Sequence, residues 1–112
     1  MAQIAKNGKS RNTGTTYVTI YTVPTGKFAI IQSIMAANVA SPEITTFVYV
    51  RWTDSSDTNN PTMIANKHFL NTRTSEECIV KTFNLEVGDA VQVKAEDASA
   101  IDYTISVLEV DL

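Results

Sequence analysis

Runs of apolar residues alternate with short polar breaks along this chain, and most of the runs favour β-strands. Residues 15–22 are rich in β-branched and aromatic side chains, which suit a pleated sheet. Residues 27–39 are apolar at both odd and even positions, which is typical of a central strand covered on both faces. A helix over 28–39 is the alternative, but the segment has neither a helical stripe nor an N-cap signal. We therefore predict two strands here.

The break between these two strands predicts a tight corner. Pro24 fixes φ and lacks an N–H donor, so it ends the first strand. Gly26 stands where a type II turn requires a positive φ. Pro24 and Gly26 are therefore predicted to have a structural role.

Five further segments carry a strand signal, and turn residues separate them: 44–53, 63–70, 77–83, 90–96 and 101–110. In the first, Val48, Val50 and Trp52 share one face and are predicted to point into the core. Phe47 and Tyr49 then lie on the opposite face, where partly exposed aromatic side chains are candidates for an interface. Seven strands without a credible helix predict an all-β fold, a single antiparallel β-sandwich with jelly-roll-like topology.

Residues 1–14 are polar and aperiodic, so we predict an extended N-terminal arm that is disordered by itself, followed by a sandwich domain over 15–112. The arm carries Lys6, Lys9 and Arg11 and no acidic residue, whereas the whole chain has a net charge of −3. This asymmetry indicates either a solvated tail or a basic arm that docks on an acidic partner. Three cations are too few for a nucleic-acid footprint, so nucleic acid is not expected as a partner.

The length of 112 residues indicates one domain. No apolar stretch approaches the length of a membrane span, and the N-terminus lacks the apolar segment of a secretory signal. A single cysteine excludes an internal disulfide framework and suits a reducing cytosol.

Candidate chemistry is sparse. His68 and Cys78 are the only residues of their kinds, and a Cys–His pair is a known catalytic arrangement, but Cys78 alternates with Val80 as a buried apolar residue would. The oxygen-rich segment 54–61 suggests calcium, yet its spacing differs from a calcium-binding loop, so a hydrophilic hairpin tip is preferred. We therefore predict no enzyme activity, no metal and no cofactor.

Three segments together resemble the small β-sandwich virion structural proteins of tailed bacteriophages, which serve in capsid decoration or cement and at necks and tails. They are YTVPTGKFAII followed by Ser33-Ile34, then LEVGDAVQV over 85–93, then AIDYTIS over 100–106. The resemblance covers about half of the chain and implies neither an enzyme nor a cofactor.

The expected function is accordingly that of a capsid decoration or cement protein on the exterior of a virion, made in the host cytoplasm. Its partners would be the major capsid protein or another virion protein, without nucleic acid or membrane, and a homo-oligomer is expected, a trimer rather than a dimer. The alternative is a neck, tail or fibre module that binds host carbohydrate. In that alternative Trp52, Tyr49 and Tyr103 stack on sugars, and Asp54, Asp57 and Asn59 bind hydroxyl groups.

Overall fold

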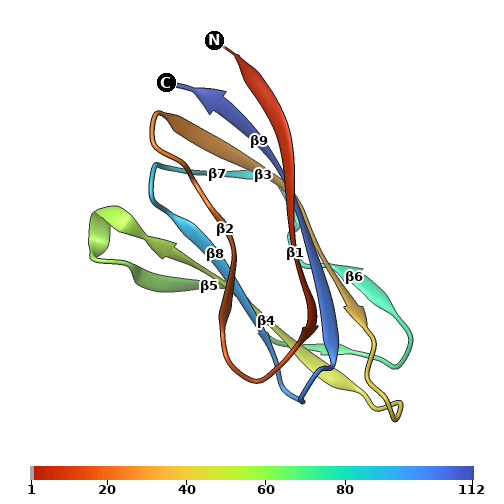
Figure 1. Cartoon of the computed structure of the whole chain (residues 1–112). Helices are drawn as coiled ribbons and strands as arrows, with labels where there is room; N and C mark the ends of the chain where they lie inside the picture. Colours follow the sequence, from red (N-terminus) through yellow and green to blue (C-terminus); the bar gives the residue numbers. More distant parts are fainter. Residues whose placement is uncertain (1) are drawn as a thin grey trace.

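Nine β-strands and one 3-10 turn form the secondary structure of residues 2–112, the part of the chain that this computed structural model describes (Figure 1). The strands are β1 (Gln3–Thr13), β2 (Val18–Thr22), β3 (Lys27–Asn38), β4 (Thr46–Asp54), β5 (Asn60–Leu70), β6 (Ser75–Glu77), β7 (Phe83–Leu85), β8 (Ala90–Ala95) and β9 (Ile101–Asp111), with the 3-10 turn η1 (Ser55–Asp57) between β4 and β5.

The strands form two antiparallel sheets packed face to face, which confirms the predicted β-sandwich. One sheet has the order β1-β9-β3-β6, with β7 also paired to β3, and the other has the order β2-β8-β4-β5. If β6 and β7 are taken as two pieces of one interrupted edge, eight strands remain, and each strand is followed by one in the opposite sheet except for the β4–β5 hairpin, as in a jelly roll. Both termini lie at the same end of the sandwich (Figure 1).

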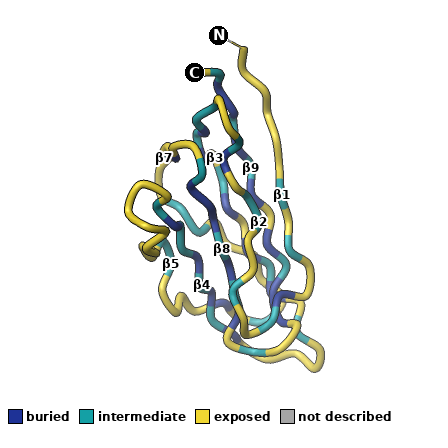
Figure 2. The backbone as a smooth tube through the Cα atoms, turned by 60° about the vertical axis from the view of Figure 1, so that its left-hand side comes forward, coloured by how far each residue is buried: buried dark blue, intermediate teal, exposed yellow. Residues whose placement is uncertain are grey.

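The first of these strands corrects the prediction for the N-terminal segment. The sequence predicts an arm over 1–14 that lies apart from the sandwich, but Gln3–Thr13 form β1 and pair antiparallel with β9, while residue 1 lies outside the described residues. The segment lacks strand periodicity because β1 is an edge strand, and most of its length is exposed (Figure 2). Backbone hydrogen bonds to a buried neighbour can hold such a strand without an apolar face of its own.

A β-bulge explains the double apolar pattern of β3. The register with β9 shifts between Ile31 and Ser33, so Ala29 and Ile31 before the shift point into the core together with Ile34 and Ala36 after it. The prediction that both faces of this strand are covered is therefore wrong. Met35, on the outer face, is 37% exposed.

The predicted strand over 77–83 is also wrong in its middle. The chain leaves the sheet between β6 and β7, and Val80 is 99% exposed. The carboxylate of Glu77 accepts hydrogen bonds from the Ile34 N–H (2.7 Å) and the Ser33 hydroxyl, and the Cys78 N–H donates to the Ile34 carbonyl (2.7 Å). The Glu77 side chain thus accepts a hydrogen bond from a backbone N–H of β3 at the point where the edge strand is interrupted.

The core between the sheets contains the residues predicted for β4, β8 and β9. Its fully buried members include Val48, Val50, Val91, Val93, Ile101, Tyr103, Ile105 and Val107. Trp52 is only partly buried and packs against the edge of this core.

Two buried polar residues connect the loops to this core. The Asn38 amide donates to the carbonyls of Ile44 (2.9 Å), Leu70 (3.2 Å) and Asn71 (3.1 Å). Asp89 accepts from the backbone N–H groups of Ser55 and Glu86, both at 2.9 Å. The Gly-Asp turn therefore anchors the tip of the β4–β5 hairpin.

Candidate docking face

Aromatic and cationic side chains alternate across the outer surface of the sheet β2-β8-β4-β5. We call this surface the aromatic–cation face and define it by seven residues: Tyr17, Phe47, Tyr49, Arg51, Lys67, Phe69 and Lys94. Phe47, Tyr49 and Arg51 occupy alternate positions of β4, so the period of the strand directs all three away from the core that Val48 and Val50 occupy.

The contacts run continuously across the sheet. The Arg51 guanidinium lies 3.7 Å from the centroid of the Tyr17 ring, and Lys94 Nζ lies 5.0 Å from that ring and 4.6 Å from Tyr49. These separations are those of cation–π contacts. At the other end of the face, the rings of Phe47 and Phe69 meet edge to face, with centroids 5.9 Å apart.

Lys67 reaches this face from a β-bulge. The register of β4 and β5 shifts between Val48 and Tyr49, which leaves Lys67 without a partner opposite it, at a φ of +55°. Bulges redirect side chains, and here Nζ of Lys67 lies 5.4 Å from the Phe47 ring centroid and 4.0 Å from the Glu96 carboxylate.

The face is basic although the chain is acidic. It carries three cations and one adjacent carboxylate, Glu96, in a protein of net charge −3. Among the described residues, neither Arg51 nor Lys94 has a carboxylate oxygen within 4.0 Å. The Glu96 carboxylate also accepts from the Tyr49 hydroxyl at 2.9 Å. The face can therefore offer positive charge and aromatic edges to an acidic surface.

The sequence analysis named only Phe47 and Tyr49 of this face as interface candidates. The outward parity of Lys94 and Arg51 was readable from the alternation of their strands. Tyr17 precedes β2, and Lys67 and Phe69 lie on a bulged edge strand, so only the sheet order brings them beside β4.

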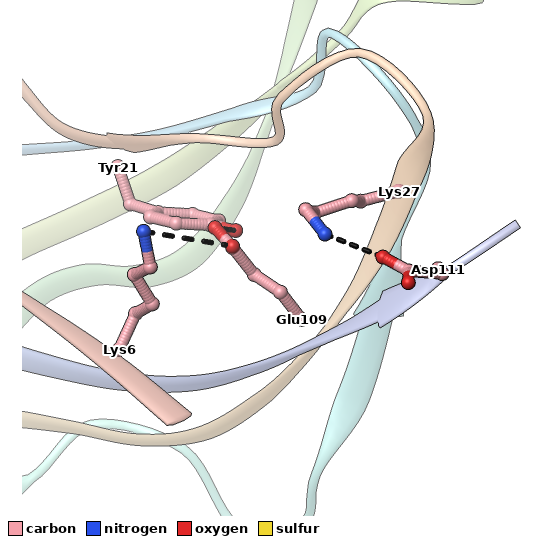
Figure 3. Close-up of polar contacts among 5 residues, drawn as sticks. All are labelled: Lys6, Tyr21, Lys27, Glu109 and Asp111. Atoms are coloured by element: carbon pink, nitrogen blue, oxygen red, sulfur yellow. Dashed lines mark hydrogen bonds and ion pairs between the residues drawn. The ribbon is translucent and has the colours of Figure 1, made fainter. Parts of the chain in front are cut away.

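The cations predicted for the arm lie on β1 and do not form one cluster. Lys6 and Lys9 are three residues apart, so they lie on opposite faces of the strand. All three are exposed, and Lys6 differs in that its Nζ lies 4.0 Å from Oε1 of the buried Glu109 (Figure 3).

Glu109 was not singled out from the sequence. It follows the inward parity of β9 and is 3% exposed. The Tyr21 hydroxyl donates to its Oε2 at 2.7 Å, and Oε1 has no hydrogen-bond partner among the described residues. Burial, followed by this contact with Glu109, raises the pKa of Tyr21 well above its usual value of 10.0. Lys6 is thus the cation that faces an incompletely paired buried acid.

Gly26 lies in the corner between β2 and β3 and has a φ of +82°. Its carbonyl accepts a hydrogen bond from the Leu112 N–H at 3.0 Å. The adjacent Lys27 forms an ion pair with Asp111, which brings the start of β3 and the end of β9 together (Figure 3).

A shallow groove of about 450 Å³ opens between β5 and the 78–84 segment. Its lining includes Trp52, Ile64, Cys78, Ile79, Val80 and Phe83.

Burial, helped by the nearby carboxylates of Glu77 and Glu76, raises the pKa of the Cys78 thiol to about 12. His68 pairs with Glu76. A thiol in that state is a poor nucleophile at neutral pH, which argues against Cys–His catalysis.

The residues of the carbohydrate alternative are not assembled into one surface. Tyr103 is 1% exposed, and its hydroxyl donates to the Lys94 carbonyl (2.7 Å) and accepts from the Tyr49 N–H (3.3 Å). Asp54 accepts from the Ser56 N–H at 3.0 Å and thereby caps η1. The prediction of Tyr103 as a sugar-stacking residue is wrong because its ring belongs to the core.

Within residues 2–112, no group of three or more His, Cys, Asp or Glu side chains is placed to hold a metal ion. No helix among these residues has the length and apolar character needed to cross a membrane.

Comparisons with known proteins relate the chain by fold. No protein-family model matches the sequence, and a search of curated proteins found no significant match. Among solved structures, it resembles a chain described under "Bacillus endospore appendages form a novel family of disulfide-linked pili", with a TM-score of 0.58 and 13% identity over 99% of this chain and 88% of that one. It also resembles a chain from the acidic stable capsid structure of Helicobacter pylori bacteriophage KHP30, with a TM-score of 0.56 and 12% identity over 97% and 87% of the two chains. At these identities the likeness shows a shared fold, one found in a pilus and in a phage capsid.

Proposed function

We propose that this chain is a virion structural protein that binds the assembled major capsid lattice as a decoration or cement subunit. The observation that carries the proposal is the aromatic–cation face, a sheet surface that is basic in an acidic protein. The shared fold with a chain of a phage capsid structure is consistent with it.

The face has the composition of a docking surface. Tyrosine and arginine are the residues on which interface binding energy concentrates. Here Tyr49 and Arg51 lie on β4, and Tyr17 packs against the Arg51 guanidinium. Phe69 is 52% exposed, so its edge is available to a partner. The positive charge of the face fits an acidic patch on the shell, and Lys9 and Arg11 on β1 are additional candidate contacts.

A co-sedimentation experiment with assembled shells that lack this chain tests the proposal. The variants Tyr49→Ala and Arg51→Gln each remove a group from the face, and Lys81→Gln is the matched control because it removes a cation from the 78–82 loop. If Tyr49 is central to the interface, its truncation costs about 2 kcal/mol, which is roughly a 30-fold loss of affinity.

The control separates a docking role from a general effect of charge. Lys81→Gln is expected to sediment like the unmodified protein. Equal binding by Tyr49→Ala, Arg51→Gln and Lys81→Gln would refute the face as the docking surface. Binding to a glycan array that disappears in Tyr49→Ala would instead favour the recognition module.

A further inference from the structure

The edge strand β1 is held almost entirely through its backbone. Nine residues of β1 stand opposite residues of β9, from Gln3 opposite Val110 to Thr13 opposite Ile101. None of the residues of β1 belongs to the hydrophobic core that the structure describes, and Ile4, its largest apolar residue, is 44% exposed. β1 therefore contributes no side chain to that core.

The position beside β9 accepts only a particular sequence. Gly8 lies opposite Ile105, and a Cβ atom there would lie well inside van der Waals contact of the Ile20 carbonyl oxygen and 3.1 Å from Ile105 Cγ2. A strand that occupies this edge therefore needs glycine at this register.

A second requirement lies two residues away. Lys6 Nζ is 4.0 Å from the buried Glu109 Oε1, which has no hydrogen-bond partner among the described residues (Figure 3). A buried carboxylate without an opposite charge is costly, so the edge of β9 favours an occupant with lysine at this position. The pair Lys6 and Gly8 makes the strand of this same chain a well-matched occupant.

From these constraints we propose that β1 is an exchangeable strand, and that β1 of one copy occupies the edge of β9 in a second copy of this chain. The contacts of the exchanged strand repeat those that β1 makes within a single chain. They include the approach of Lys6 to Glu109 and the close packing of Gly8 against the Ile20 carbonyl. Exchange of an identical element is a low-cost way to connect protomers.

The connection after β1 suits such an exchange. Residues 14–17 lie outside any strand and join β1 to β2, which belongs to the opposite sheet. The chain just before them is irregular, because the register with β9 shifts between Ser10 and Thr13 and Asn12 has a φ of +50°. Within one chain this short connection gives β1 a high effective concentration, of millimolar order for short flexible linkers. Exchange is therefore favoured at high local concentrations of subunits, as in an assembly. The inference concerns contacts between copies and does not depend on the proposed capsid partner.

Disulfide trapping between two full-length variants tests the exchange. One variant carries Asn7→Cys and the other Ser106→Cys, both in a Cys78→Ser background, because residues 7 and 106 stand opposite each other in the register. The two are mixed from about 10 µM to about 1 mM, incubated and then oxidised. We expect a cross-linked heterodimer whose yield rises with concentration, and its native mass separates a reciprocal dimer from a larger ring.

Two controls make either outcome decisive. A single chain that carries both Asn7→Cys and Ser106→Cys is expected to form an internal disulfide, which shows that the geometry permits the bond. Asn7→Cys mixed with Asp57→Cys places the second thiol at the hairpin tip of the other sheet and is expected to give no rise in yield. If the single chain closes but the 7–106 mixture gives no heterodimer, or no more than the 7–57 mixture, the exchange is refuted.

Discussion

Gly8 is the residue whose replacement by alanine the fold opposes most directly. A Cβ at this position meets backbone atoms of β2, which cannot rotate away, so we expect Gly8→Ala to lower the free energy of unfolding by about 1–3 kcal/mol. Gly14→Ala is the control because no atom lies within 4 Å of the added Cβ. Urea unfolding of both variants checks the prediction, and equal midpoints would contradict it.

Gly26 presents a different constraint. No atom lies near its added Cβ, but its φ of +82° is unfavourable for any β-branched residue. We expect Gly26→Val to lower the free energy of unfolding by about 1–3 kcal/mol. A melting temperature equal to that of the unmodified protein would show that the 24–27 corner has no structural role.

Cys78 allows a direct test of the non-catalytic assignment. A pKa raised from 9.0 to about 12 lowers the thiolate fraction at pH 8 on the order of a thousandfold, so alkylation of the native protein should be far slower than that of free cysteine. Iodoacetamide labelling followed by mass spectrometry measures the rate, with the urea-unfolded chain as the control. Rapid labelling of the native protein would reopen the question of a reactive thiol.

Among the structural elements, β1 determines how a deletion at the N-terminus affects stability. A tail that does not pack on the domain could be deleted without effect, but deletion of residues 2–14 removes the strand opposite nine residues of β9 and the cation near Glu109. We expect a lower melting temperature and, because the β9 edge is then unpaired, stronger self-association. Calorimetry and light scattering measure the two effects. An unchanged melting temperature would mean that β1 contributes nothing to stability.

The stability of the whole molecule should decline at both extremes of pH. The ion pair with Lys27 holds the pKa of Asp111 below its usual 3.8, so this contribution is complete above that value and is lost as the pH falls through the lower pKa of the folded state. Burial raises the pKa of Tyr21 and Tyr103 above 10.0, so these residues ionise first in the unfolded chain and stability falls as the pH rises beyond about 10.

Chemical unfolding across the pH range, with two substitutions, checks both limits. The stability difference between the unmodified protein and Asp111→Asn should shrink below about pH 4. In Tyr21→Phe the alkaline decline should be weaker. A difference for Asp111→Asn that stays constant down to pH 2 would contradict the assigned ion pair.

Much of this architecture follows from local pattern. Alternation in β4, β8 and β9 placed Val48, Val93 and Ile105 in the core, since the period of a strand determines which side chains share a face. The same alternation placed Phe47 and Tyr49 on the outer surface. The turn residues Pro24 and Gly26 marked the 24–27 corner because their backbone preferences are properties of single residues.

Other features depended on contacts between distant segments. β1 has no pattern of its own, because the backbone of β9, about a hundred residues later, holds it in the sheet. The bulge in β3 makes one buried face look like two in the sequence, and the Glu77 carboxylate interrupts an edge that alternation alone would continue. The aromatic–cation face likewise requires the order β2-β8-β4-β5 to bring Tyr17 and Lys94 beside Tyr49. Local sequence thus determined which segments are strands and which side chains face inward, whereas sheet order, bulges and edge pairing arise from long-range contacts that only the tertiary structure supplies.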